Sequence, residues 1–273
     1  MANPKFDTYR HFKRPGLMRR RVDVWLPARY HAEPERKFPV LYMHDGQNAF
    51  TRSPYVGTGW MVHECIDTLA AEGKITPPVV AAISCTLNRI GDYLPQKPLG
   101  YPNAVDYVKR NAPRYLGLGS EVSDAYLRLI VQDIKPFIDS KYRVLNDAEH
   151  TAMMGSSMGG LISLYALAEY PHVFGKVACL STHWPILGEY FMRYLRETLP
   201  NAGAHNKLYF DHGGAGLDQQ YAPYQAEADA LIKAKGYQDG LDFQSLFFEN
   251  DDHNELFWSA RLHLPMTFLF ASQ

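Results

Sequence analysis

The sequence has little cysteine, no long hydrophobic run and no excess of either charge. Its 273 residues include three cysteines, Cys65, Cys85 and Cys179, which lie far apart and form no C-x-x-C pair. That count predicts neither a disulfide framework nor a zinc site, so we expect buried free thiols. No run of about 18 apolar residues occurs, so no membrane span is predicted. The polar residues 1–15 lack the apolar core of a signal peptide, which favours a cytoplasmic location.

The charge is nearly balanced, with a formal net charge of -1. This balance gives no indication of nucleic-acid binding. The one basic cluster, Arg19 to Arg21, precedes a predicted strand and is interpreted as its solvated start. The composition, 46% hydrophobic and 21% charged, is that of a globular chain with a sizeable core.

Hydrophobic periodicity predicts strands that alternate with helices, without a linker or a break in composition. This order indicates one α/β domain over residues 1–273, with a doubly wound, mostly parallel sheet. From Thr86 to Ser120 the pattern stops. We expect an ordered loop or small cap over the site there, the alternative being a surface excursion. The predicted strands are 20–27 (an outer strand), 39–43, 78–85, the segment before Gly155, 175–181, 207–211 and 242–249, and the helices are 61–72, 122–142, 161–170, 187–199, 221–234 and 255–270.

The stretch Gly155-Ser156-Ser157-Met158-Gly159 stands between a predicted strand and a predicted helix. In that context G-x-S-x-G forms a nucleophile elbow, a sharp turn that exposes the serine at the sheet edge. The glycines avoid side-chain clashes in the tight turn. The sequence therefore predicts Ser157 as a nucleophile, with the amide of Met158 as one oxyanion donor. The alternative is a Gly/Ser turn without chemistry.

A serine hydroxyl needs a base, and the base in turn needs an acid that orients it. His253 follows the last predicted strand and fits the chain order serine, acid, histidine. His263 lies inside the final predicted helix and His205 precedes a strand, so both are poorer candidates. The acid should follow the strand before it. Asp218, in a glycine-rich loop, is the favoured candidate, and Asp211 at the strand's end is its rival.

The second oxyanion donor is expected in the loop after the strand at 39–43. Gly46 allows a sharp turn there, and the amide of Gln47 is the candidate. His44 and Asp45 are expected to shape this loop, and no metal role is predicted for them.

Six motifs in order resemble the putative-esterase family of α/β-hydrolases. This family includes feruloyl esterases, enterobactin-type siderophore esterases, S-formylglutathione hydrolases and mycolyl transferases. The resemblance runs from about residue 20 to the last residue, and it implies Ser157, His253 and Asp218 as the triad, with Gln47 and Met158 as backbone donors. The motifs are VLYMHDGQN (40–48), NRIGDYLP (88–95), GSSMGG (155–160), LSTHWP (180–185), FDHGGAGLD (210–218) and DHNELFW (252–258).

The sequence thus predicts a serine esterase that acts on a small or aromatic ester and needs no metal or other cofactor. An acyltransferase with the same triad and a non-catalytic binding module remain alternatives. A homodimer is compatible with the sequence, which does not fix the oligomeric state. The side chains considered for the substrate pocket are Arg89, Asp92, Tyr93, His183 and Trp184, each with packing as its alternative role.

Overall fold

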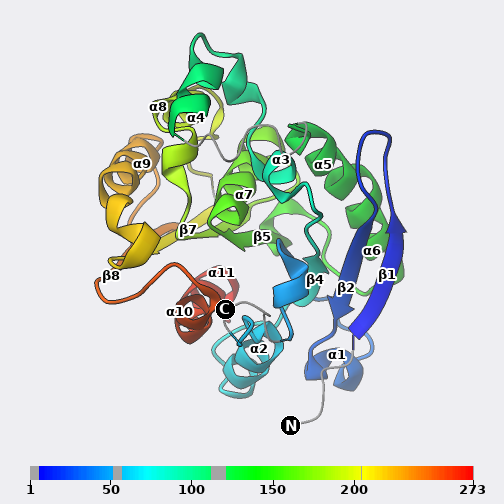
Figure 1. Ribbon diagram of the computed structural model, residues 1–273. Coiled ribbons are helices and arrows are strands. Elements are labelled where there is room, and N and C mark those ends of the chain that lie inside the picture. The colour runs from blue at the N-terminus through cyan, green and yellow to red at the C-terminus, as the bar shows by residue number, and fades with distance from the viewer. Residues whose placement is uncertain (1–5, 52–56, 112–120, 204, 273) are drawn as a thin grey trace.

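The computed structural model describes residues 6–51, 57–111, 121–203 and 205–272. Its strands form one sheet in the order β1-β2-β4-β3-β5-β6-β7-β8 (Figure 1). The pairs β1–β2 and β2–β4 are antiparallel, and all later pairs are parallel. The strands are β1 Phe6–Phe12, β2 Arg20–Trp25, β3 Val40–Met43, β4 Val79–Ile83, β5 Thr151–Ser156, β6 Lys176–Leu180, β7 Lys207–Gly213 and β8 Phe243–Phe248.

The central strands β3, β4 and β5 are buried at every position. Parallel strands covered on both faces have this uninterrupted apolar pattern, which made them predictable. The edge strand β1 was not predicted, because its sequence FDTYRHF mixes polar and aromatic residues and is largely exposed. The prediction of an outer strand at 20–27 was wrong, since β2 lies between β1 and β4 and is mostly buried.

Helices cover both faces of the sheet and bury two separate hydrophobic cores (Figure 1). One core contains residues of α5, α6, α7, α8 and α9, and the other contains residues of α2, α10 and α11. The helices are α1 Ala28–Ala32, α2 Val62–Ala71, α3 Arg89–Tyr93, α4 Ala104–Asn111, α5 Ser123–Leu129, α6 Lys135–Lys141, α7 Met158–Glu169, α8 Glu189–Thr198, α9 Ala222–Ala234, α10 Glu255–Arg261 and α11 His263–Phe270.

Two long predicted helices are each divided. The predicted helix 122–142 consists of α5, a π-helical turn at Ile130–Ile134 and α6, with Pro136 in the first turn of α6. Proline has no amide hydrogen and is tolerated at a helix start, which explains the new beginning there. The predicted helix 255–270 is divided at Leu262 into α10 and α11.

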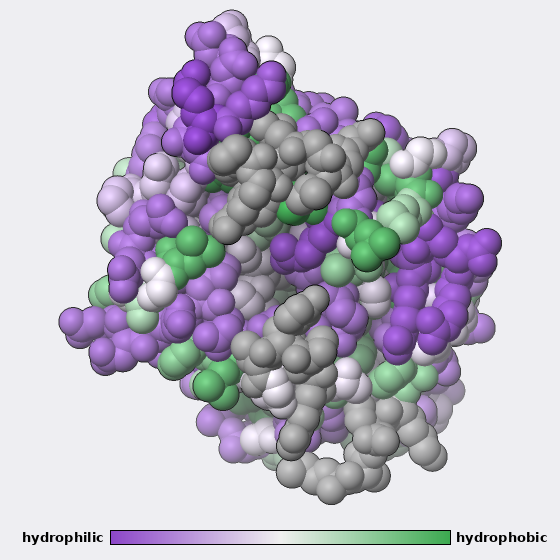
Figure 2. Space-filling view, in the orientation of Figure 1, coloured by the Kyte–Doolittle hydropathy of each residue, from purple (hydrophilic) through white to green (hydrophobic). Residues whose placement is uncertain are grey.

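The segment expected to be irregular, 86–120, contains short helices where it is described. These are α3, a 3-10 turn η2 at Lys97–Gly100, and α4. Part of this prediction, at 112–120, lies outside the described residues. The face seen in Figure 2 is mostly hydrophilic, with small separate hydrophobic patches, so the described surface there offers no extended apolar area. No helix among the described residues is long and apolar enough to cross a membrane.

Candidate active site

Ser157 stands between β5 and α7 with φ 58° and ψ -120°, a backbone conformation that is strained for any residue other than glycine. Hydrogen bonds to one neighbouring segment hold it there. Its N–H donates to the carbonyl of Leu180 at 2.9 Å, and its carbonyl accepts from the N–H of His183 at 3.2 Å. A Cβ at Gly155 would lie 2.7 Å from the carbonyl carbon of Gly159, so the turn requires glycine at position 155.

His253 and Asp218 are joined directly. The distance from Nδ1 of His253 to Oδ1 of Asp218 is 2.5 Å. The other carboxylate oxygen accepts from the hydroxyl of Ser181 at 2.6 Å and from the N–H of Gly213 at 2.7 Å. Burial alone would raise the pKa of Asp218, but hydrogen bonds from His253, Ser181 and Gly213 and the nearby imidazole outweigh it, so its pKa is lowered. The carboxylate is therefore ionised and held in one orientation at neutral pH.

The rival acid Asp211 is bound elsewhere. It lies inside β7, which extends two residues beyond its predicted end, and its side chain is fully buried. Its carboxylate accepts hydrogen bonds from Arg261 at 2.9 Å and from the hydroxyl of Tyr209 at 3.0 Å. Burial raises the pKa of Asp211 against these favourable contacts. The structure thus brings Asp218 to His253 and gives Asp211 an ion pair beneath the site.

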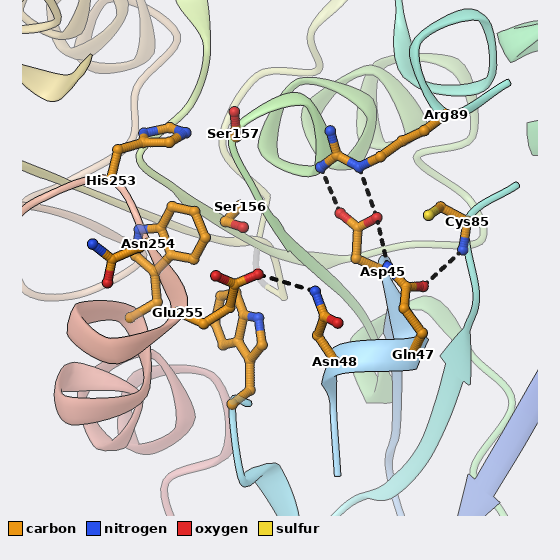
Figure 3. A pocket seen from close by; sticks show the side chains of 12 residues that line it. Asp45, Gln47, Asn48, Cys85, Arg89, Ser156, Ser157, His253, Asn254 and Glu255 are labelled. Atoms are coloured by element: carbon orange, nitrogen blue, oxygen red, sulfur yellow. Dashed lines mark hydrogen bonds and ion pairs between the residues drawn. The ribbon is translucent and has the colours of Figure 1, made fainter. Parts of the chain in front are cut away.

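Ser157 and His253 open into the same cavity of about 590 Å³ (Figure 3). In Figure 3 the imidazole ring of His253 extends toward Ser157. The cavity combines polar groups with two tryptophan rings, an arrangement typical of a small-molecule site. The lining residues are Asp45, Gln47, Asn48, Trp60, Cys85, Arg89, Ser156, Ser157, His253, Asn254, Glu255 and Trp258.

The loop after β3 forms one wall of the cavity and is fixed by its side chains. Asp45 has φ 52° and accepts two hydrogen bonds from the guanidinium of Arg89. The side-chain carbonyl of Gln47 accepts from the N–H of Cys85 at 3.0 Å. Gln47 lies within the 3-10 turn η1 at Gly46–Asn48, and Met158 is the first residue of α7. Amides at the start of a helical turn have no acceptor within it, so those of Gln47 and Met158 can donate to a ligand.

Ionisation states around this loop follow from burial and from the neighbouring charges. Burial raises the pKa of Asp45, but the Arg89 guanidinium outweighs burial and lowers it, and the pKa of Arg89 is raised in return. Burial lowers the pKa of His44 to about 3, so this imidazole is neutral. Burial raises the pKa of Cys85 to about 12, and its thiol is therefore not an activated nucleophile.

The model of one family, described as putative esterase, matches residues 18–237. The chain belongs to this putative-esterase family. A relative from Bacillus subtilis (strain 168), the uncharacterized protein YbbA, is 26% identical over 180 residues, 66% of this chain and 61% of that protein. An endo-1,4-beta-xylanase/feruloyl esterase from Xylanibacter ruminicola is 23% identical over 253 residues, 91% of this chain and 29% of that protein. The chain thus spans less than two thirds of the length of these curated relatives.

Among solved structures, a ferulic acid esterase superposes on this putative-esterase chain with a TM-score of 0.68 and 18% sequence identity. The match covers 97% of each chain. It confirms the predicted α/β-hydrolase fold.

Of the side chains considered for the pocket, Arg89 lines the cavity, and the other four are placed elsewhere by the structure. Asp92 is buried and pairs with Arg20. The hydroxyl of Tyr93 lies behind the wall and accepts from the N–H of Asp45 at 3.1 Å. His183 and Trp184 are buried against α9 and the turn before it, bonded to Tyr221 and Gln225 respectively. Their positions after buried strands suggested pocket roles, but side chains at such positions also pack inward.

Several residues that the sequence did not single out also line the cavity, among them Asn48, Trp60, Asn254, Glu255 and Trp258. Glu255 is the first residue of α10, and its Oε1 accepts from the side-chain amide of Asn48 at 3.0 Å. Asn254 caps α10, since its side chain accepts from the N–H of Leu256 at 3.1 Å. The sequence signal that could have identified Glu255 as a cavity residue is its position two residues after His253.

One group of side chains of the type that binds metals lies outside the cavity. Among the described residues Asp147, Glu149 and His150 have ligand atoms within 4.8 Å of one another. They precede β5 and therefore lie at the end of that strand opposite Ser157. His150 already shares a contact of 2.8 Å with Asp147.

Proposed function

We propose that the chain is a serine carboxylic-ester hydrolase that works through an acyl-enzyme. The observation that carries the proposal is the contact of Asp218 with His253, which lines the same cavity as Ser157. Family membership supports the reaction class. The names of two similar proteins mention feruloyl or ferulic acid esters, which makes aromatic esters the first candidates.

In this mechanism the Nδ1–H of His253 donates to Asp218, which leaves the lone pair of Nε2 free to accept a proton. Ser157 Oγ attacks the ester carbonyl while its proton passes to Nε2. The carbonyl oxygen becomes an anion and accepts hydrogen bonds from the amides of Gln47 and Met158. The bond to the alcohol breaks, and the imidazolium returns its proton to the leaving oxygen. Asp218 stabilises the imidazolium throughout.

Deacylation repeats these steps with water. His253 takes a proton from a water molecule as its oxygen attacks the acyl-enzyme carbonyl, and the bond to Ser157 Oγ then breaks with return of the proton. The products are an acid and an alcohol. An acceptor alcohol in place of water would give acyl transfer by the same groups, and product analysis with and without added alcohol distinguishes the two.

The test compares wild type with Ser157→Ala on a panel of esters. The panel holds p-nitrophenyl acetate, butyrate and octanoate, methyl ferulate, S-formylglutathione and a catechol siderophore lactone. We expect hydrolysis by the wild type of at least one ester, labelling of Ser157 by a fluorophosphonate probe, and loss of both in the variant. Activity that survives the substitution would remove Ser157 as the nucleophile. A folded wild type that the probe does not label would favour a binding module.

A further inference from the structure

Glu255 places a carboxylate in the cavity wall without a cationic partner among the described residues. Its contact there is the neutral amide of Asn48, at 3.0 Å. In Figure 3 this carboxylate extends into the space below Ser157, opposite the wall formed by Arg89. A carboxylate held by a single amide keeps acceptor capacity for a ligand.

The other charges that line the cavity compensate each other. Arg89 is bound through both prongs of its guanidinium to Asp45. Asp251, which lies outside the cavity lining two residues before His253, pairs with Arg261. Among the described lining residues, the negative charge of Glu255 is therefore left uncompensated. The ionised Asp218 behind His253 adds to the negative electrostatic potential in the cavity. A cavity with walls of low dielectric concentrates such a potential and attracts ligands of the opposite sign.

Two tryptophans also line the cavity, and Trp258 stands on the same helix as Glu255. The rings of Trp60 and Trp258 stack with centroids 5.7 Å apart and planes 24° apart. The indole N–H of Trp258 donates to the hydroxyl of Ser181 at 2.9 Å, so its polar edge is occupied behind the cavity wall. Cations bind favourably over the faces of tryptophan rings, and the negative charge of Glu255 adds to this attraction.

We propose that this cavity selects esters by charge and prefers substrates that carry an ammonium group, with Glu255 as the specificity-determining residue. The inference rests on the proposed esterase function and adds a substrate class to it. Cationic esters are favoured by Glu255 and the tryptophan rings, neutral esters are accepted, and anionic esters are repelled. Arg89 does not reverse this order, because Asp45 neutralises it.

The experiment compares acetylcholine with its neutral isostere 3,3-dimethylbutyl acetate, in which carbon replaces the ammonium nitrogen. The ratio of their kcat/KM values is measured for wild type and for Glu255→Gln. Glutamine keeps the shape and the hydrogen bond with Asn48 and removes only the charge. We expect the ratio of cationic to neutral ester to fall about tenfold in the variant. Because each variant is compared on both esters, differences in intrinsic ester reactivity cancel.

The matched control is Glu35→Gln, which removes an exposed carboxylate outside the cavity and should leave the ratio unchanged. A second measurement does not depend on turnover. Choline should protect Ser157 from a fluorophosphonate probe at lower concentration than 3,3-dimethylbutanol does, and this difference should disappear in Glu255→Gln.

An unchanged ratio or equal protection by both alcohols would overturn the inference while leaving the esterase function intact. Failure of the probe to label folded wild-type protein would instead reject the esterase function and, with it, the inference.

Discussion

Arg89 and Asp45 are joined by two parallel hydrogen bonds, from Nε to Oδ1 at 2.8 Å and from Nη2 to Oδ2 at 2.6 Å. The pair connects α3, in the segment between β4 and α5, to the loop after β3 that carries Gln47. A backbone amide can stabilise an oxyanion only if it is already in place when the charge develops. The ion pair therefore supports the proposed oxyanion site from the side of the 86–120 segment.

Replacing Arg89 by lysine should lower kcat by about tenfold, because lysine keeps the charge but cannot form the two-pronged contact. The measurement is kcat and KM on the best ester of the panel. The control is Arg110→Lys, an exposed position in α4, which should behave as wild type. Full activity in Arg89→Lys would show that the loop after β3 does not depend on this contact.

Replacing Asp218 by asparagine should lower kcat by about 10⁴-fold, since the imidazole would lose both its oriented tautomer and the charge that stabilises it. Asp211→Asn provides the contrast. It leaves Arg261 without its buried partner and should lower the free energy of unfolding by about 3 kcal/mol, with a much smaller effect on the kcat of the folded fraction. The reverse result would make Asp211 the catalytic acid.

His44 should make the fold sensitive to acid. Burial, with the nearby Arg89 and Arg20, lowers its pKa to about 3, against the opposing effect of Asp45. Between pH 6.5 and 3 the unfolded chain therefore binds a proton at this site and the folded chain does not, so stability decreases as the pH falls. Because of this residue alone, the free energy of unfolding should be about 2 kcal/mol lower at pH 5 than at pH 7.5.

Urea unfolding at pH 7.5 and pH 5 measures that cost. His44→Asn retains a donor near the position of Nδ1, which contacts the hydroxyl of Tyr126 at 2.8 Å. Between pH 7.5 and pH 5 its free energy of unfolding should fall by about 2 kcal/mol less than that of wild type. His172→Asn, at an exposed position, is the control. Equal pH dependence in all three proteins would contradict a neutral buried His44.

Gly155→Ala should lower the free energy of unfolding by about 2 to 4 kcal/mol, because the added methyl group meets rigid backbone rather than a flexible side chain. The nearest atom is the carbonyl carbon of Gly159, 2.7 Å away. Gly100→Ala, where a Cβ would meet nothing within 4 Å, should remain within about 0.5 kcal/mol of wild type. Chemical denaturation measures the free energy of unfolding of both variants. Similar losses in the two variants would contradict the close approach of Gly155 to the backbone of Gly159.

The parts of the fold with a strong periodic signal were predictable. The uninterrupted apolar runs of β3, β4 and β5 identified buried strands, and the glycines around Ser157 identified the turn. Strand β1 could not be found, because an exposed edge strand is stabilised by backbone pairing to β2 rather than by its own side chains. The two divided helices show that apolar periodicity continues across a proline or a turn and does not record where a helix stops.

For the site, chain order indicated His253, and the glycine-rich loop favoured Asp218 over its rival Asp211. The structure places His253 and Asp218 in contact. The pocket walls could not be predicted in the same way. Asp92 and Arg89 stand in one short motif, yet one pairs with Arg20 in the core and the other faces the cavity. Only the direction of each side chain separates them, and three-dimensional packing decides that direction.

Asn254 stands between the proposed base and the proposed selectivity residue, and its side chain caps the helix that begins with Glu255. One short turn therefore sets the positions of both neighbours. A change that moves Glu255 to suit a new substrate also moves His253. The charge preference for the substrate therefore cannot change without affecting the position of the proposed base. The opposite wall, with Arg89, is attached to other elements, and we expect diversification of substrate size among relatives to begin there.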